Sequence, residues 1–263
     1  MRVGIAGLGT VGTAIAKALQ AGAIPGVVLE AVSVRRPESA SRLSLRCDIA
    51  TFTELANRCD VVIESLPRAL FRAVAEPAID RGRIFVPLSV GALLDETDLI
   101  EKARATGARI LVPTGALLGL DAVKAAAEGS ISAVTIETRK PPNGLSGAPY
   151  LEQHGITLEG LTEPKLVFSG SARDAARGFP ANVNVAAALS LAGIGPDRTR
   201  MDIWADPGVT RNTHRIVVEA DSARLTMMIE NVPTAENPRT GRITALSALT
   251  LLRDLVGVVR IGS

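Results

Sequence analysis

The chain has few aromatic residues and few histidines for its length of 263 residues. Phenylalanine, tryptophan and tyrosine make up only 3% of the sequence, whereas hydrophobic residues make up 47%. The core must therefore consist mainly of Ala, Val, Leu and Ile side chains, as in closely packed α/β proteins. A chain of this length buries a sizeable core and suits one large domain or two modest ones.

The chain also has only two cysteines, a small net charge and no long apolar run. Cys47 and Cys59 lack the spacing of metal ligands, so no metal site is expected. A chain of this size needs no disulfide scaffold, which favours reduced thiols and a cytoplasmic location. The formal net charge of +2 gives no basic field for nucleic acid. No apolar run is long enough to cross a bilayer, so no membrane segment is expected.

The first twenty residues carry the clearest motif. Residues 3–6 are apolar, as in a short buried strand, and three glycines with the spacing G-x-G-x-x-G follow them. Apolar residues then recur at the helical period. This order of strand, glycine turn and helix predicts a dinucleotide-binding fingerprint, and a glycine-rich turn of another α/β protein is the weaker alternative. The expected dinucleotide contacts in this motif are Gly7, Gly9, Thr10, Val11 and Gly12.

The end of the second expected strand, residues 27–34, is the place where this fold binds the adenosine ribose. An acidic residue commonly binds the ribose 2′-hydroxyl there. This chain instead has Ser33 followed by Arg35 and Arg36. A hydroxyl beside two guanidinium groups suits a 2′-phosphate through charge-assisted hydrogen bonds. The pattern therefore favours NADP slightly over NAD, and the competing interpretation is that both arginines are solvated loop residues.

Strands and helices continue to alternate up to Pro113. The expected strands are residues 60–65, 83–90 and 109–112, and the expected helices are residues 68–81 and 96–106. This alternation predicts parallel strands joined by right-handed crossovers. Ser65 and Leu66 end the third strand and are expected near the cofactor, at the carboxyl end of the sheet. Residues 1–113 are thus predicted to form a Rossmann dinucleotide-binding domain.

The alternation stops after Pro113, and residues 114–240 predict an α+β domain with a mostly antiparallel sheet. A tight turn at Asp221 and Ser222 is expected between the last two strands. A closing helix lies within residues 241–263 and is expected to pack back on the first domain. The expected strands of this half are residues 131–140, 166–169, 200–205, 213–220 and 223–229, and a helix over 171–191 is interrupted at Gly178, Phe179 and Pro180.

Chemistry is expected from this second half. His214 follows a polar segment and is a candidate general acid or base, although a histidine on a surface loop is an equally good interpretation. Lys140 precedes two prolines and is expected to hold a carboxylate, unless it is solvated as most lysines are. An asparagine before the Ala-rich helix is either functional or a helix N-cap. The other polar candidates are Asn182, Asn184, Asp206, Asn212, Glu230, Asn231 and Arg239.

Five ordered segments of the sequence resemble the L-aspartate dehydrogenases. The resemblance covers nearly the whole chain. The segments are PTGA…GLDA at residues 113–122, TRKPP at 138–142, FSGSA…FPANVNVAA at 168–187, ADP…NTHRI at 205–216 and ENVP…ENPRT at 230–240.

The resemblance implies oxidative deamination of L-aspartate with NAD or NADP, which gives iminosuccinate and then oxaloacetate and ammonia. Iminosuccinate is also a precursor in NAD biosynthesis. The resemblance further implies that His214 is the catalytic residue and that Ala116 and Asn184 contact the nicotinamide side of the cofactor. Lys140 is expected to hold one substrate carboxylate, and Asn212 or Thr213 to assist it.

The chain departs from the family pattern at two places. Glu64 is followed by Ser65, Leu66 and Pro67 where the family often has Ala-Ala-Ser, and arginines replace the acidic residue near the end of the second strand. Two alternatives stay open, another NAD(P)-linked amino-acid or semialdehyde dehydrogenase and an NADP-binding regulator without turnover. A homodimer is expected, because open antiparallel sheets of such second domains often pair.

Overall fold

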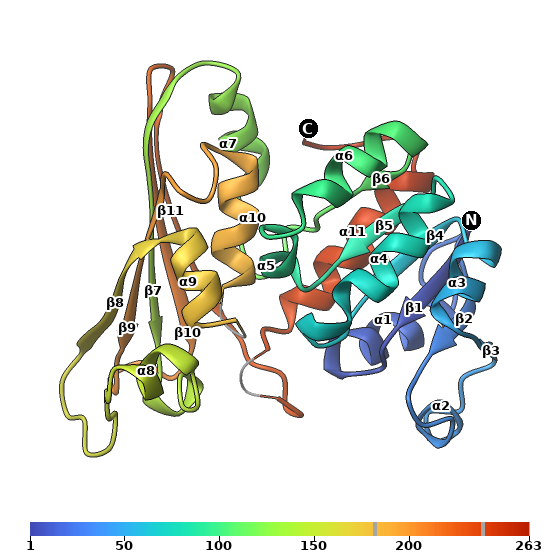
Figure 1. The fold of residues 1–263 in the computed structure, drawn as a ribbon, viewed down its shortest axis with the longest axis horizontal. Coiled ribbons are helices and arrows are strands. Elements are labelled where there is room, and N and C mark those ends of the chain that lie inside the picture. The colour runs from blue at the N-terminus through green and yellow to red at the C-terminus, as the bar shows by residue number, and fades with distance from the viewer. Residues whose placement is uncertain (181–182, 238–239, 263) are drawn as a thin grey trace. The chain divides into compact units, whose positions relative to one another are not determined.

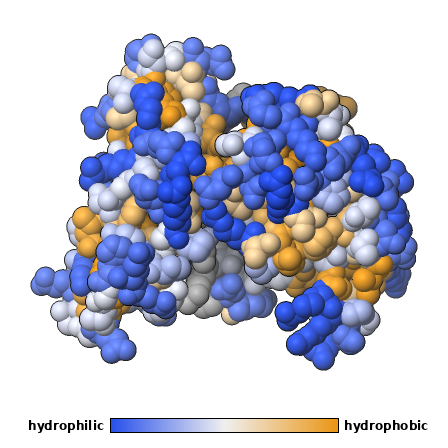
Figure 2. Space-filling view, viewed as in Figure 1, coloured by the Kyte–Doolittle hydropathy of each residue, from blue (hydrophilic) through white to orange (hydrophobic). Residues whose placement is uncertain are grey.

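The computed structural model describes residues 1–180, 183–237 and 240–262. The chain divides into two compact units, Met1–Pro113 with Thr244–Arg260, and Thr114–Ile243 with Ile261–Ser263 (Figure 1). Hydrophilic and hydrophobic residues are mixed on the face that Figure 2 shows, in keeping with a sequence that is 47% hydrophobic. Within the described ranges, no helix is both long and apolar enough to span a membrane.

The first unit contains a six-stranded parallel sheet, which confirms the predicted Rossmann architecture. The strand order is β3-β2-β1-β4-β5-β6. This is the order of a doubly wound dinucleotide-binding sheet, in which strands are added outward in one direction from β1 and in the other from β4. The strands are β1 (Arg2–Ala6), β2 (Val28–Ser33), β3 (Asp48–Ile49), β4 (Val61–Glu64), β5 (Ile84–Pro87) and β6 (Arg109–Ile110).

Helices cover both faces of this sheet and close two apolar clusters. One cluster joins Leu55, Val74 and Leu99 to the sheet, and the other joins Ile15 and Leu252 to it. The closing helix α11 therefore buries its apolar side in the same cluster as α1. The helices of the unit are α1 (Thr10–Gln20), α2 (Glu38–Arg42), α3 (Phe52–Arg58), η1 (Arg68–Leu70), α4 (Phe71–Asp80), α5 (Val90–Leu93), α6 (Thr97–Thr106) and α11 (Ile243–Val256).

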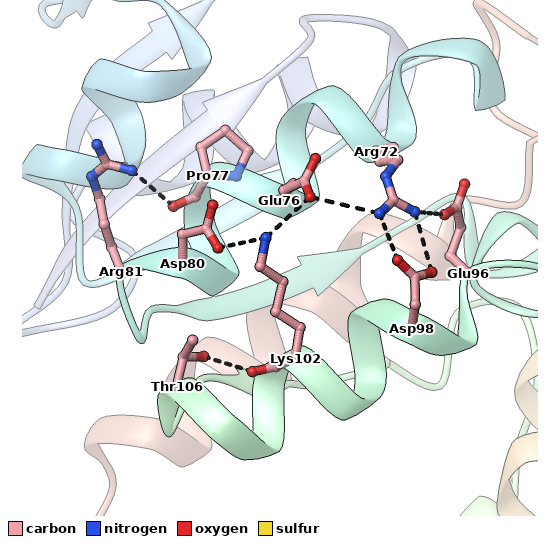
Figure 3. A network of polar contacts seen from close by, with 9 residues as sticks. All are labelled: Arg72, Glu76, Pro77, Asp80, Arg81, Glu96, Asp98, Lys102 and Thr106. Carbon is pink, nitrogen blue, oxygen red and sulfur yellow. Dashed lines mark hydrogen bonds and ion pairs between the residues drawn. The ribbon is translucent and has the colours of Figure 1, made fainter.

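A network of ion pairs joins α4 to α6 on the outside of the unit (Figure 3). Arg72 lies 2.5 Å from both Glu96 and Asp98, and Lys102 lies 2.7 Å from Asp80. Hydrogen bonds from Arg72 lower the pKa of Asp98. Because these side chains are between 26% and 58% exposed, each pair contributes little to stability, and the network mainly fixes the two helices side by side.

The second unit contains a five-stranded mixed sheet in the order β11-β10-β7-β9-β8. The prediction of a mostly antiparallel sheet is confirmed, because only the pairing of β7 with β9 is parallel. Glu219 at the end of β10 pairs with Arg224 at the start of β11, on the two sides of the predicted turn. The strands are β7 (Ile131–Lys140), β8 (Lys165–Ser171), β9 (Thr199–Ala205), β10 (Asn212–Ala220) and β11 (Arg224–Asn231).

Helices α7, α9 and α10 lie side by side along one face of this sheet (Figure 1). On β7 the buried residues Ile136, Thr138 and Lys140 recur with the period of two that a half-covered strand requires. The other face carries the more exposed residues. The helices are α7 (Leu120–Ala127), η2 (Pro142–Gly144), α8 (Pro149–Gln153), α9 (Ala172–Gly178) and α10 (Asn184–Ala192).

Candidate active site

The three motif glycines each have a different steric environment. Gly7 has a φ of +98°, and a Cβ there would lie 2.3 Å from the carbonyl oxygen of Ser65. A Cβ on Gly12 would lie 2.1 Å from the carbonyl oxygen of Gly7. Apart from its chain neighbours, no described residue has a heavy atom within 4 Å of the Cβ position of Gly9. Gly7 and Gly12 therefore permit close packing, whereas Gly9 leaves open space beside the start of α1.

The N-terminus of α1 offers a second feature that fits a dinucleotide. Gly9 is the N-cap residue, and no side chain caps the helix or adds an acid to its first turn. The first N–H groups of a helix have no partner within it and carry the positive end of its dipole. The predicted contacts Thr10 and Val11 are the first two residues of α1. The open space at Gly9 and these N–H groups fit a pyrophosphate.

The end of β2 lies directly beside the glycine turn. The carbonyl oxygen of Ser33 accepts a hydrogen bond of 2.9 Å from the N–H of Gly7. Arg35 and Arg36 follow and are exposed. Neither guanidinium has a hydrogen bond or ion pair with the part of the chain that the structure describes. Both therefore remain open to a phosphate, which agrees with the prediction of a 2′-phosphate contact and equally with that of solvated arginines.

The loop after β4 contacts the same turn. Ser65 donates a backbone hydrogen bond of 2.8 Å to the carbonyl oxygen of Ala6. The side chain of Leu66 lies 2.8 Å from the Cβ position of Gly7, and Ser65 Oγ lies 3.2 Å from that of Gly12. The first unit thus brings together the predicted cofactor residues Gly7, Gly9, Thr10, Val11, Gly12, Ser33, Ser65 and Leu66.

In the second unit, strand register gathers the predicted catalytic residues at one end of the sheet. His214 on β10 lies opposite Thr138 on β7 in the antiparallel ladder. Lys140 is two residues beyond Thr138, and Asn212 is two residues before His214. Because strand residues two apart share a face, these four side chains lie on one face at the end where β7 finishes and β10 begins.

His214 is deeply buried in this cluster. It is 3% exposed, and its Nδ1 lies 2.9 Å from Thr138 Oγ1. Burial, together with the smaller effect of the charge of Lys140, lowers the pKa of His214 to about 3. The interpretation as a surface-loop histidine is therefore wrong. The imidazole is neutral at physiological pH, and with its proton on Nδ1, donated to Thr138, Nε2 keeps a lone pair that accepts a proton.

Lys140 is also buried, with 4% of its surface exposed, so the interpretation as a solvated lysine is wrong. The N–H of Asp206 donates a hydrogen bond of 2.8 Å to the carbonyl oxygen of Lys140, which fixes the end of β7 against β9. The positive charge of the Lys140 ammonium group suits a substrate carboxylate.

Asn231 connects this cluster to Ala116. It pairs with Asn212 in the ladder between β10 and β11, and its Nδ2 donates a hydrogen bond of 3.1 Å to the carbonyl oxygen of Ala116. Asn184 is the first residue of α10, and Val183 holds the N-cap position without a side-chain hydrogen bond. The N-cap interpretation of Asn184 is therefore wrong. Asn182 and Arg239 lie outside the described residues.

An open pocket of about 480 Å³ lies next to Asn212. It is formed by the segments that follow β7, precede β10 and follow β11, so it lies at the end of the sheet that also carries Lys140. Polar side chains contribute to its wall, and they belong to Asn143, Thr210, Arg211, Asn212 and Asn237. The pocket therefore offers hydrogen-bond donors to a polar ligand of small size.

The second histidine lies in a different environment. His154 follows α8, is exposed and stacks on Tyr150 with 3.9 Å between the ring centroids. It has no place in the cluster around Lys140. Sequence reasoning missed Thr138 as the partner of His214, and it named Asn231 without assigning it a role. The period of two along residues 131–140 places Thr138 on the face of Lys140 and was the available signal.

Comparison with known proteins agrees with these features. Residues 121–255 match the family model for the C-terminal part of aspartate dehydrogenase, and residues 7–113 match the NAD-binding domain of homoserine dehydrogenase. A crystal structure of aspartate dehydrogenase from Thermotoga maritima superposes with a TM-score of 0.77. The match is 22% identical and covers 100% of this chain and 99% of that chain, so it shows the shared fold.

Two relatives with higher identity cover the whole chain. The L-aspartate dehydrogenase of Bradyrhizobium diazoefficiens is 53% identical over 267 residues, which cover 100% of this chain and 94% of the relative. The L-aspartate dehydrogenase of Methanosarcina acetivorans is 38% identical and is covered over 100% of both chains. An NAD-binding domain and relatives of this kind identify a dehydrogenase that uses a nicotinamide cofactor. The chain therefore belongs to the L-aspartate dehydrogenase family.

Proposed function

We propose that this protein catalyses the NAD(P)-dependent oxidative deamination of L-aspartate to iminosuccinate, which water converts to oxaloacetate and ammonia. The observation that carries this proposal is the buried, neutral His214, hydrogen-bonded to Thr138 beside Lys140 and Asn212. Relatives named L-aspartate dehydrogenase support the choice of substrate. The reaction is reversible, so oxaloacetate with ammonia is the substrate pair of the opposite direction.

The first unit holds the cofactor in this proposal. The open space at Gly9 and the N–H groups of Thr10 and Val11 receive the pyrophosphate. Ser33, Arg35 and Arg36 bind the ribose. The exposed guanidinium groups of Arg35 and Arg36 suit a 2′-phosphate and favour NADP slightly over NAD. A bound nicotinamide ring supplies the acceptor for the hydride of the substrate. The remaining contacts are assigned to Gly7, Gly12, Ser65, Leu66, Ala116 and Asn184.

The second unit supplies the acid–base chemistry. Loss of hydride from the substrate Cα requires a neutral amine, so a base must first remove a proton from the ammonium group. His214 Nε2 is that base, because Nδ1 is held by Thr138 and burial keeps the ring neutral. After this proton has passed to solvent, the neutral imidazole activates the water that attacks the imine carbon. Lys140 binds one carboxylate, and Asn212, at the wall of the pocket, assists in orienting the substrate.

We assign residues 1–113 with the closing helix of residues 241–263 to a cofactor domain, and residues 114–240 to a catalytic and dimerisation domain. A homodimer is supported by the sheet face opposite α10, where Leu166 lies opposite Trp204 and Met228 is 56% exposed. Exposed apolar residues on an uncovered sheet favour pairing with a second copy. We place the enzyme in the cytoplasm, where its product feeds NAD biosynthesis.

The test is the absorbance of the reduced cofactor. Purified protein should form NADPH or NADH with L-aspartate, and should consume it with oxaloacetate and ammonia. Flat traces in both directions with both cofactors would refute the proposal. Turnover of another amino acid in preference to L-aspartate would support the dehydrogenase activity but refute L-aspartate as its substrate.

A further inference from the structure

The last residue of β4, Glu64, is a carboxyl group buried inside the first unit. It is 0% exposed and follows three fully buried apolar residues of the strand. Burying a carboxyl group is costly unless hydrogen bonds replace the lost water. Burial raises the pKa of Glu64, and hydrogen bonds from Leu66 and Ser89 act against that shift. Burying an apolar side chain at this position would cost less free energy than burying this carboxyl group.

The hydrogen bonds of Glu64 join two loops at the carboxyl end of the sheet. Oε1 accepts a bond of 2.7 Å from the N–H of Leu66, in the loop after β4. Oε2 accepts a bond of 3.0 Å from the N–H of Ser89, in the loop after β5. The hydroxyl of Ser89 lies 3.1 Å from Oε1 and donates a bond of 2.8 Å to the carbonyl oxygen of Leu66. One side chain thus fixes both loops.

The residue between these anchored positions touches the dinucleotide motif. Ser65 lies between Glu64 and Leu66, and its carbonyl oxygen is 2.3 Å from the Cβ position of Gly7. Its Oγ is 3.2 Å from the Cβ position of Gly12. A side chain on either glycine would therefore crowd Ser65, so the Ser65–Leu66 loop packs directly against the glycine turn. The position of this loop therefore controls the shape of the turn and of the start of α1.

We propose that Glu64 is a positioning residue of the dinucleotide site, which fixes the Ser65–Leu66 loop against the glycine turn and thereby sets the affinity for the cofactor. The inference rests on the dinucleotide site of the proposed function and is independent of the identity of the substrate. Glu64 itself need not touch the cofactor, since it acts through Ser65 and Leu66.

The test compares Glu64→Gln with the wild type. Glutamine keeps the volume but has one oxygen and one NH₂ group, so either Leu66 N–H or Ser89 N–H must face a donor. Calorimetric titration of the apoprotein with NADH and with NADPH should show a dissociation constant raised about tenfold for both. In turnover, the KM for the cofactor should rise by the same factor, whereas kcat at saturating cofactor should change less.

Two further variants separate positioning from stability. Ser89→Ala removes the hydroxyl and keeps both backbone bonds, so it should raise the dissociation constant by about two- to threefold. Asp80→Asn removes a carboxylate from the α4–α6 network of Figure 3, at the end of α4 remote from the glycine turn, and should leave it unchanged. Thermal unfolding of each apoprotein reports whether the variant is folded.

Unchanged cofactor affinity in a folded Glu64→Gln variant would overturn the inference. If that variant does not fold, Ser89→Ala decides, since a raised dissociation constant supports the inference and an unchanged one refutes it. Failure of the proposed function looks different. In that case the wild type itself binds neither cofactor, or binds one and turns over no aspartate.

Discussion

The imidazole Nδ1 of His214 lies 2.9 Å from the hydroxyl oxygen of Thr138, its partner across the β7–β10 ladder. Thr138 is 0% exposed and His214 is 3% exposed, so water does not compete for this bond. The ring orientation and the tautomer of the histidine therefore depend on one hydroxyl group. An orienting hydrogen bond of this kind leaves the opposite nitrogen, Nε2, as the reactive atom.

Thr138→Val tests this relationship with little change in volume. Loss of the hydroxyl frees the imidazole to rotate and to adopt the wrong tautomer, so kcat for aspartate oxidation should fall about tenfold or more. Thr138→Ser keeps the hydroxyl and should retain most of the activity. Steady-state kinetics at saturating cofactor measures both variants. Equal rates for Thr138→Val and the wild type would show that Thr138 does not orient His214 for catalysis.

The buried histidine also predicts acid sensitivity of the apoprotein. The pKa of His214 is about 3 in the folded chain and about 6.5 in the unfolded chain, so the unfolded state takes up a proton first as pH falls. Its contribution to the free energy of unfolding is therefore complete above about pH 7 and is lost toward about pH 3. At pH 5 the loss amounts to about 2 kcal/mol.

Urea unfolding at pH 7.5 and pH 5 measures this loss. The variant His214→Gln lacks the titrating group, so its stability should fall less between the two pH values, by a difference of about 2 kcal/mol. An identical pH dependence in wild type and variant would mean that His214 is not kept neutral by burial.

The glycine turn predicts opposite effects of two alanine substitutions. The Cβ of Gly9→Ala meets no atom of another described residue within 4 Å, its chain neighbours apart, so the apoprotein should keep its thermal midpoint. The new methyl group should weaken binding of NADH and NADPH by about tenfold or more. Gly12→Ala places a Cβ 2.1 Å from a backbone oxygen and should destabilise the fold itself. Thermal unfolding and cofactor titration distinguish the two. Native cofactor affinity in Gly9→Ala would argue against a pyrophosphate at this turn.

The arginines after β2 predict which cofactor is preferred. Replacing Arg35 and Arg36 together by alanine should weaken NADPH binding by about tenfold or more, and NADH binding by no more than about twofold. The two dissociation constants are measured by titration of the apoprotein. An equal loss of affinity for both cofactors, or no loss for either, would mean that these side chains do not bind the 2′-phosphate.

Local patterns predict much of this fold. The period of two along residues 131–140 and the glycine spacing near the N-terminus each reflect interactions within one element and its immediate neighbours. β3 has only two residues and is not predicted from the sequence, because so short a strand has no measurable period. Helix α3 is not predicted either, although the capping box of Thr51 and Glu54 signals the start of that helix.

The candidate site depends on contacts that no local pattern contains. Thr138 and His214 are 76 residues apart, and only the register of β7 with β10 makes them partners. Likewise, residue type alone does not decide whether His214 and Lys140 are functional residues or solvent-exposed ones. Tertiary packing buries both side chains, which excludes the second interpretation. Glu64 directly precedes the segment Ser65–Pro67 that departs from the family pattern, but its bonds to the loop after β5 depend on the parallel pairing of β4 with β5.

The central claim is that His214 performs acid–base chemistry and does not bind the cofactor. The most direct measurement is kcat for L-aspartate oxidation in His214→Ala, together with the dissociation constant of the reduced cofactor. We expect a loss of kcat of about a hundredfold or more with cofactor affinity nearly unchanged. Full activity in a folded His214→Ala variant would contradict it.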